Sequence, residues 1–580
     1  MLVSTLLIEK MSRYASTILA GALWLAFTSP QTVCAATPTK GIYVGSEFYA
    51  PTTTWQNTAR DSSFSRLFIF TLGVDSAGTL TAFGQTLCQN GVYVGDSTWG
   101  SKLAACKAAP SSVNRIEICI GSWGSTAFTN IKNLIASQGT GTGSILYRNF
   151  LALKNATGVD AIQFDDEGTY DVNSMVAFGN MLYGMGLKIS LTPYTVQSFW
   201  VNVKSQLGGK VDTIYLQCYD GGAGNDPANW TAAFGGFKVT PGLWGNTDTT
   251  TSTMTKMRNW NASVDGLPGG FMWLNGNMPS DGGYKWSEDL KLGLDAPFFI
   301  LKNRNTGMTM DLVNGNTADG ASVQTYHLDY NDTAERWAII PTEGGNHFKI
   351  VGYLSAKCVD IVGGSTAENA LIESRQYYTG HADQQWDLVD AGSGFYYIKN
   401  VKSGKVLTAT GTTDFSPIYQ LTSTGAHAQQ WRPMPQGDYF LKAAHSGKYV
   451  SAQGGSSAND THIVQYDWQD NPWYKWNFVN KSYGWYGVYS VNAPGKVLCV
   501  NAASTVAGEY LHLWDYNSGN IGDQDVRIRF KLDGTCKFYF RHDGMSWDVG
   551  GGSQSNNASI NQYPDTANLW QQFYMERVHE

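Results

Sequence analysis

The chain has 580 residues, of which 42% are hydrophobic and only 15% are charged, and its formal net charge is -7. This length exceeds that of a single domain, so we expect about three or four domains, each with its own core. The acidic balance leaves no basic surface that could neutralise phosphates, so we expect no nucleic-acid partner. The 64 glycines, 31 tyrosines and 20 tryptophans favour a turn-rich extracellular protein with many short strands.

Residues 1–35 have the pattern of a secretory signal peptide. Lys10 and Arg13 precede an apolar run at 18–27, and Val33-Cys34-Ala35 provides a small-residue cleavage site. The apolar run is shorter than the roughly 18 residues that cross a bilayer, and no later segment approaches that length. We therefore expect a secreted protein with no membrane span.

Residues 36–294 alternate short apolar runs with segments that can form helices. The stretches 126–138 and 173–186 have amphipathic helical patterns. Eight is the number of strands that closes a barrel, and a βα alternation about 250 residues long predicts a (β/α)8 TIM barrel. The eight expected strands are 41–45, 66–72, 115–121, 159–164, 187–193, 212–219, 238–245 and 269–275.

Beyond residue 295 the pattern changes to short strands separated by Gly, Asn and Asp turns, and it repeats. Units of roughly 45 residues each contain an apolar pair, a turn and a closing aromatic. Three such units form one all-β β-trefoil, so we expect two of them, at 295–435 and 436–580. The units begin near Phe298, His347, Gly394, Asp438, Trp485 and Lys537, and the closing aromatics are Trp337, Trp386, Trp431, Trp476, Phe530 and Phe573.

The closures 384-QQW, 429-QQW and 571-QQF, with 358-CVD, 499-CVN and 547-WDV earlier in their units, resemble the ricin B-type lectin repeat. The resemblance covers about residues 296–579 and implies sugar sites that pair an early Asp with a later aromatic. The closing aromatics themselves are expected to fill the trefoil core, so the sugar sites need different residues. Three units keep the sugar-binding pattern: Asp311 with Tyr326 and His327, Asp360 with Gln376 and Tyr377, and Asp548 with Asn561 and Tyr563. The other three have Thr408, Ser451 and Asn501 near the corresponding place.

The segment 158-GVDAIQFDDEGTYD concentrates acids at the end of the fourth expected barrel strand. Side chains alternate along a strand, so Gln163, Asp165 and Glu167 share one face and Asp166 lies on the other. Neighbouring carboxylates in a partly desolvated site raise at least one pKa, so Glu167 could donate a proton to a glycosidic oxygen beside Asp165. The alternative is a helix cap or a loop ion pair.

The same segment looks like the DGxDxDxE signature of glycoside hydrolase family 18, which comprises chitinases and endo-β-N-acetylglucosaminidases. Three further stretches resemble the family's strand motifs in the same order: 120-IGSW, 217-QCYD and 270-GFMW. The resemblance implies that Glu167 is the general acid and base, and that Asp165 orients the substrate's acetamido oxygen as the nucleophile. It further implies that Tyr219 binds the acetamido group, that Gln217 and Asp220 support the sugar, and that Trp273 stacks beneath it.

Two departures from the family pattern matter. Gln163 stands where the family has its middle Asp, so Asp165 lacks the usual partner for sharing a proton. Ser122 replaces a glycine in the third-strand motif. Only some thirty residues separate the seventh and eighth strands, which predicts a shallow, endo-acting groove.

The resulting hypothesis is a secreted endo-acting glycosidase that cleaves β-1,4 linkages of N-acetylglucosamine in chitin or in the chitobiose core of N-glycans. Substrate-assisted retaining catalysis requires no cofactor and no metal. The alternative, supported by Gln163, is an inactive glycan-binding lectin. We expect a glycan or glycoprotein partner and a monomer. After cleavage seven cysteines remain, of which Cys88 and Cys106 could form a bridge while the others are buried thiols.

Overall fold

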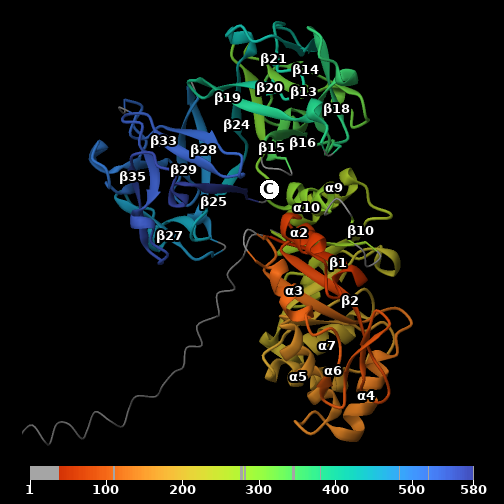
Figure 1. The fold of residues 1–580 in the computed structure, drawn as a ribbon. Helices are drawn as coiled ribbons and strands as arrows, with labels where there is room; N and C mark the ends of the chain where they lie inside the picture. The colour runs from red at the N-terminus through yellow and green to blue at the C-terminus, as the bar shows by residue number, and fades with distance from the viewer. Residues whose placement is uncertain are drawn as a thin grey trace, which may run out of the picture. The chain divides into compact units, whose positions relative to one another are not determined.

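The structure is a computed structural model that describes residues 38–578 apart from 109–110, 265, 275–277, 280–282, 343–345, 379, 470, 483 and 520–521. The expected signal peptide and Cys34 lie outside the described residues. The chain divides into residues 1–35 and a second compact unit, residues 36–580. Within that unit the strands fall into three consecutive groups along the chain (Figure 1).

The first group contains a closed barrel, in which eight parallel strands pair in a ring among the described residues. Strand β1 pairs with both β2 and β11, which closes the sheet. Each strand overlaps one of the eight that the sequence predicts. Their bounds are β1 (Thr39–Val44), β2 (Arg66–Val74), β6 (Arg115–Gly121), β7 (Ala161–Asp165), β8 (Lys188–Leu191), β9 (Val211–Gln217), β10 (Thr240–Trp244) and β11 (Gly269–Trp273).

Helical segments occur in the connections between these strands. The helices expected at 126–138 and 173–186 are present as α4 and α6. The α-helices described are α2 (Thr53–Asp61), α3 (Trp99–Cys106), α4 (Ala127–Gln138), α5 (Ile145–Thr157), α6 (Val172–Gly184), α7 (Gln197–Leu207), α8 (Pro227–Ala233), α9 (Thr250–Ser263) and α10 (Tyr284–Leu294). The antiparallel strands β3 (Leu80–Ala82), β4 (Gln85–Gln89) and β5 (Val92–Tyr93) extend β2 and were not predicted.

The barrel strands bury side chains on both faces, as parallel strands covered on both sides do. Ile162 and Phe164 belong to the large apolar cluster that also contains helix residues such as Phe178. The opposite face of the sheet carries a separate, largely aromatic cluster that includes Tyr43 and Tyr219. The alternation expected for β7 is therefore present, because its apolar residues pack beneath the helices.

The second and third groups are antiparallel sheets of short strands, thirteen and twelve among the described residues. The first of these sheets contains β12 (Phe299–Asn303), β13 (Thr309–Leu312), β14 (Ala321–Tyr326), β15 (Arg336–Pro341), β16 (Phe348–Gly352), β17 (Cys358–Ile361), β18 (Ala370–Arg375), β19 (Trp386–Gly392), β20 (Phe395–Asn400), β21 (Val406–Thr408), β22 (Ser416–Pro417), β23 (Tyr419–Leu421) and β24 (Trp431–Pro435).

The last sheet contains β25 (Asp438–Ala443), β26 (Tyr449–Ala452), β27 (Thr461–Tyr466), β28 (Lys475–Ser482), β29 (Trp485–Ser490), β30 (Lys496–Val500), β31 (Leu511–Asp515), β32 (Val526–Phe530), β33 (Cys536–Phe540), β34 (Ser546–Val549), β35 (Ala558–Tyr563) and β36 (Phe573–Arg577). Each of the two sheets surrounds its own apolar core.

The closing tryptophans fill these cores and are fixed by a repeated hydrogen bond. Trp337, Trp386, Trp431 and Trp476 are all 0% exposed. Each indole N–H donates to the backbone carbonyl of an early strand of its own unit, at distances between 2.9 and 3.1 Å. A buried indole needs such a partner, so these residues close the core and are not available to stack on a sugar.

The closing residue predicted for the fifth unit is wrong. Gln524 makes the same backbone contacts as Gln384 of the second unit, because each side chain bridges two chain segments. Trp386 lies two residues after Gln384 and closes the second unit. Val526 lies two residues after Gln524 and is 0% exposed, so Val526 is the closing residue of the fifth unit. Phe530 lies at the end of the strand, and its ring is 5.0 Å from that of Phe299 in the other core.

The predicted Cys88–Cys106 bridge is absent, since all seven cysteines in the described part of the chain are free and buried. Cys88 lies in β4 and Cys106 ends α3. Burial raises the pKa of each of these two thiols to about 12, so both stay protonated and behave as apolar groups.

Candidate functional site

Residues from several barrel strands meet at one edge of the sheet. Asp165 ends β7, Gln217 ends β9 and Trp273 ends β11. Because all eight strands are parallel, their carboxyl ends open at the same edge, where loops can build a site. The Gln217 amide donates to Asp165 Oδ1 at 2.9 Å and to the backbone carbonyl of Thr192 at 3.2 Å. Two of the predicted site residues are thus in direct contact.

Asp165 and Glu167 form a coupled acidic pair. Asp165 is 4% exposed, and burial followed by the negative charge of Glu167 raises its pKa well above the usual carboxyl range. Glu167 is half-buried; burial raises its pKa, although hydrogen bonds with Asp165 and Gln217 oppose the shift. Such a pair takes up its protons as a unit and holds one of them more tightly than an isolated carboxyl would.

Asp166 has a structural role in the loop that follows. Its carboxylate accepts hydrogen bonds from the backbone N–H groups of Gly168, Thr169 and Tyr170, at 2.8 to 3.1 Å. Asp166 is therefore a cap within the loop, which is a structural role. Asp165 and Glu167, on either side of it, form the carboxyl pair. The turn that carries Glu167 is fixed by this cap.

Gln163 is completely buried beside the aromatic cluster of the barrel. Its Oε1 accepts a hydrogen bond from the Tyr43 hydroxyl at 3.0 Å, whereas its Nε2 has no hydrogen-bond partner among the described residues. An amide cannot be ionised, so this position adds no charge to the pair formed by Asp165 and Glu167. On the other side of Asp165, the Cys119 sulfur lies 4.0 Å from Oδ2.

Aromatic side chains surround the carboxyl pair. Tyr219 is 8% exposed, and burial followed by the charge of Asp165 raises its pKa well above the usual tyrosine value. Trp273 is partly buried, with its ring 5.1 Å from Tyr43 and 4.6 Å from Phe70. Asp220 is exposed at the rim, and its negative charge contributes to the raised pKa of Glu167.

Sequence reasoning did not select Tyr43, Phe70 or Trp244. Phe70 and Trp244 pack against the same aromatic cluster as Trp273, and the buried indole nitrogen of Trp244 has no hydrogen-bond partner in the described part of the chain. The available signal was strand alternation, which places Tyr43 on the same face as the residues it contacts. Tyr43, Phe70 and Trp244 lie outside the four motifs that resemble glycoside hydrolase family 18, so the sequence indicates only that they are buried core residues.

The first trefoil unit assembles the predicted sugar-binding residues and adds two from another unit. Asp311 is 3% exposed and accepts from the Gln324 amide at 3.0 Å on the paired strand. The Tyr326 ring is 4.4 Å from that of His327 and 5.4 Å from that of Phe415, a 59% exposed residue. Asp414 lies 3.0 Å from His327 Nδ1, and this contact raises the pKa of the imidazole.

The second unit differs from the prediction in its partner residues. Asp360 pairs across the strands with Glu373 rather than with Gln376, and Gln384 donates to its carboxylate at 3.2 Å. Burial raises the pKa of Asp360 to about 6. The Tyr377 ring has the Lys349 ammonium 4.0 Å from its centroid, so one face is already covered.

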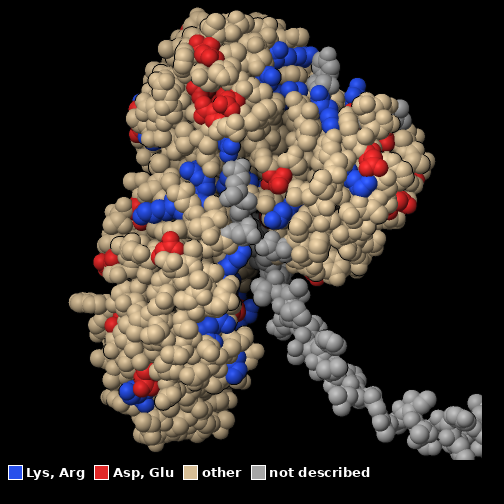
Figure 2. All heavy atoms as spheres, turned by 180° about the vertical axis from the view of Figure 1, so that it is seen from behind, with Lys and Arg blue, Asp and Glu red and all other residues tan. Residues whose placement is uncertain are grey.

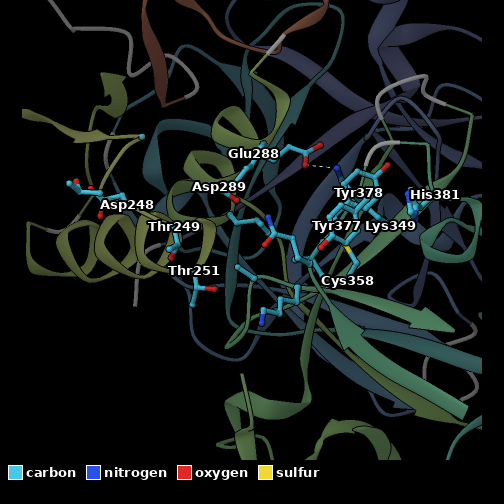
Figure 3. A pocket seen from close by; sticks show the side chains of 18 of the residues that line it. Asp248, Thr249, Thr251, Glu288, Asp289, Lys349, Cys358, Tyr377, Tyr378 and His381 are labelled. Carbon is cyan, nitrogen blue, oxygen red and sulfur yellow. Dashed lines mark hydrogen bonds and ion pairs between the residues drawn. The ribbon is translucent and has the colours of Figure 1, made fainter. Parts of the chain in front are cut away.

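Tyr377 and Lys349 also line a cavity of about 840 Å³ (Figure 3). Further residues of the first trefoil, such as Cys358 and Tyr378, line the same side, and residues of α9, α10 and the loop before α9, including Asp248 and Glu288, line the other. Lys349 pairs with Glu288. Asp165 and Glu167 do not line this cavity. The candidate catalytic site is the carboxyl pair and not this cavity. Bond cleavage needs titratable groups with shifted pKa values, and a large cavity volume does not provide them.

The sixth unit brings Asp548 and Asn561 together as predicted. The two residues are cross-strand partners, and the Gln571 amide donates to Asp548 at 3.0 Å. Burial raises the pKa of Asp548. Tyr563, two residues beyond Asn561 on β35, is 44% exposed. Tyr326 occupies the same position relative to Gln324 in the first unit.

Two further properties concern the whole described chain. Within the described ranges no cluster of three or more His, Cys, Asp or Glu could hold a metal ion. None of the helices that the structure describes is long and apolar enough to cross a membrane.

The comparison with protein families bears on the C-terminal region. A model of the family described as "Ricin-type beta-trefoil lectin domain-like" matches residues 285–375, 343–421 and 427–514. The designed three-fold symmetric protein ThreeFoil is 32% identical, with a TM-score of 0.23, over 24% of this chain and 97% of that chain. The Rhizoctonia solani agglutinin is 20% identical, with a TM-score of 0.22, over 25% and 97% of the two chains.

The agglutinin from Abrus precatorius is 18% identical, with a TM-score of 0.21, over 48% of this chain and 97% of that chain. Comparison with curated proteins gave no match. The matched family segments agree with the repeated closing tryptophans and with the two antiparallel sheets. The C-terminal region of this chain therefore consists of ricin B-type β-trefoil lectin domains.

Proposed function

We propose that the closed barrel is a (β/α)8 glycosidase of the family 18 type, and that the trefoils bind glycans. The observation that carries the proposal is the Asp165–Glu167 pair. Two carboxyls with raised pKa values sit at the carboxyl edge of a parallel barrel, held by Gln217 and bordered by aromatic rings. Charged groups are costly to bury, so such an arrangement favours a catalytic role over a purely structural one.

The proposed reaction cleaves a β-1,4 bond next to N-acetylglucosamine. The carbonyl oxygen of the substrate's acetamido group attacks C1, and Glu167 gives its proton to the departing glycosidic oxygen. Asp165 and Tyr219 orient the acetamido group. Water then adds to C1 of the cyclic intermediate, loses a proton to Glu167 and restores the acetamido group with retained configuration. Trp273 supplies a stacking surface, and Gln217 and Asp220 support the sugar.

The substrate is chitin or the chitobiose core of N-glycans, and the enzyme is secreted and monomeric in this proposal. The exposed rings of the lectin units would hold the barrel near glycan-rich targets. Export rests on the pattern of residues 1–35 alone. The proposal requires neither a cofactor nor a metal ion.

The experiment compares the parent protein with Glu167→Gln on a high-mannose glycoprotein and on chitin oligomers. We expect the parent to release reducing sugar from one of them, and the variant to lose at least about a hundredfold in rate, because the amide cannot donate the proton. Glu509→Gln, a change of the same type in a trefoil loop, serves as the control and should keep the parent rate. Equal rates for Glu167→Gln and the parent would contradict the proposal.

A second candidate is a glycan-binding protein without hydrolytic activity. The buried Gln163 favours it, since a neutral amide occupies the position of the family's middle Asp. In that case the parent and Glu167→Gln would both retain glycans on a glycoprotein matrix, and neither would release sugar.

A further inference from the structure

Three aromatic side chains form a row along one face of β31 and the residue before it. Tyr510, His512 and Trp514 alternate with Leu511 and Leu513, which are 0% exposed in the core. The ring of His512 lies 5.8 Å from that of Tyr510 and 5.4 Å from that of Trp514. Trp514 is 43% exposed, so the row ends in an open indole face.

The neighbouring strand β27 adds an imidazole to this row, and the residue before that strand adds a carboxylate. His462 pairs with His512 across the two strands, and its ring stacks on Tyr510 at 4.1 Å. Asp460 is anchored by its backbone N–H, which donates to the Leu513 carbonyl at 2.9 Å. Its carboxylate lies 2.8 Å from His512 Nδ1 and accepts from the Tyr510 hydroxyl at 3.4 Å, with more than half of its side chain exposed.

The strand register explains why the repeat pattern does not reveal this group. The short helical turn Val313–Gly315 of the first unit corresponds to Asn501–Ala503 of the fifth, since both contain a left-handed central residue. Asp311, two residues before the first turn, therefore corresponds to Cys499 and not to Asn501. Cys499 is buried and cannot accept hydrogen bonds as a carboxylate does.

We propose that Trp514, His512 and Asp460 form a binding site for a neutral hexopyranoside, in which Asp460 from the fourth unit replaces the acid missing at position 499. The C–H face of the sugar stacks on Trp514, and the sugar hydroxyls donate to the Asp460 carboxylate. His512 holds that carboxylate beside the ring. Trp514 is in register with Tyr326 and Tyr563, because each stands two residues beyond the partner of the early position. This inference rests on the proposed glycan binding by the trefoils.

The test uses the full chain carrying Tyr326→Ala and Tyr563→Ala, which removes the two open rings of the predicted sites. Lactose and methyl α-mannopyranoside serve as probes, since neither contains the acetamido group expected to enter the barrel. Saturation-transfer NMR reports contact between aromatic protons and sugar C–H groups, and titration gives the dissociation constant. Trp514→Ala and Asp460→Asn are added separately, with Tyr574→Ala as an exposed aromatic control.

We expect the double variant to bind one of the probes, and each added change at position 514 or 460 to weaken binding by at least about fivefold. Tyr574→Ala should leave it unchanged. Unchanged affinity in both Trp514→Ala and Asp460→Asn, or no binding by the double variant while the parent binds, would overturn the inference alone. A parent protein that binds neither these sugars nor any glycoprotein would overturn glycan binding by the trefoils as well.

Discussion

The buried carboxyl of Asp165 lowers the stability of the folded protein at neutral pH. The folded state raises its pKa above the ordinary value of about 3.9, so ionising it is harder in the folded chain than in the unfolded chain. Below the ordinary carboxyl pKa the group is protonated in both states and has no effect. As pH rises above that value, the unfolded chain gains its charge more easily, and the folded state loses relative stability.

Asp165→Asn should therefore stabilise the protein near neutral pH. The amide keeps an oxygen that can accept from Gln217 and removes the buried charge. We expect the free energy of unfolding near pH 7 to rise by on the order of 1 kcal/mol, the usual size of a single stabilising substitution. The gain should vanish near pH 3.5. Urea denaturation at both pH values measures it, and an equal effect at the two values would contradict the raised pKa.

At this scale the sequence predicted the polar residues of the candidate site and two of its aromatics, Tyr219 and Trp273, but not the rest of the aromatic wall. Asp165, Glu167 and Gln217 stand out because charged and amide side chains are rare in buried strands. Tyr43 and Phe70 do not, since an aromatic in a strand is compatible with any core. Their role depends on which strands lie next to each other in the closed ring, and one sequence does not give that information.

The loop between β7 and α6 is the element that positions Glu167. Asp166 satisfies three successive backbone N–H groups at the start of this loop, and Asp171 caps α6 at its end by accepting from the Ser174 backbone N–H at 2.9 Å. Both acids stabilise the same segment, but only Asp166 lies next to Glu167. The two can therefore be separated by mutation.

Asp166→Ala should lower both stability and turnover. The loss of three charge-assisted hydrogen bonds should reduce the free energy of unfolding by about 2 to 3 kcal/mol. The turn carrying Glu167 would lose its anchor, so we expect kcat to fall at least about tenfold with little change in KM. Thermal denaturation and steady-state kinetics measure the two effects.

Asp171→Ala is the matched control, because removing a helix cap costs about 1 kcal/mol and leaves the turn at Glu167 in place. Its kcat should match that of the parent. A kcat reduced equally in both variants would show that the loop acts only through general stability.

The regular elements were predictable and the irregular ones were not. The eight barrel strands are runs of apolar residues long enough to be buried on both faces. The β3–β5 extension was missed because its strands are only two to five residues long, too short to show a clear strand pattern. In the fifth unit a valine closes the core, and the true position could be identified only from the contacts of Gln524.

For the whole molecule, the small number of charges bears on how it would meet a glycan. Figure 2 shows small groups of acidic and basic side chains scattered over a largely uncharged face. A surface of this kind offers little long-range attraction to a charged partner. Recognition would depend on short-range stacking and hydrogen bonds, which the half-buried ring of Tyr326, the exposed ring of Tyr563 and their neighbouring acids would supply. Each such site is weak when it acts alone.

Several weak sites on one chain should act through effective concentration. If the barrel is the proposed glycosidase, a glycan held by one trefoil would keep the barrel close to other glycans on the same target, which would lower the apparent KM for a densely glycosylated protein. A short free oligosaccharide cannot bridge two sites, so the trefoils would not lower its apparent KM. In the proposed function the contribution of the trefoils therefore depends on the substrate, although the chemistry proposed at Glu167 is the same.

Tyr326→Ala combined with Tyr563→Ala should raise KM for a densely glycosylated protein by about tenfold or more. The kcat/KM for a short soluble oligosaccharide should stay at the parent value, because the barrel is untouched. Parallel assays on the two substrates measure the ratio, and Tyr574→Ala controls for the loss of an exposed aromatic. If both substrates were affected equally, the tyrosines would be acting through stability; if neither were affected, the trefoils would not deliver the barrel to its substrate.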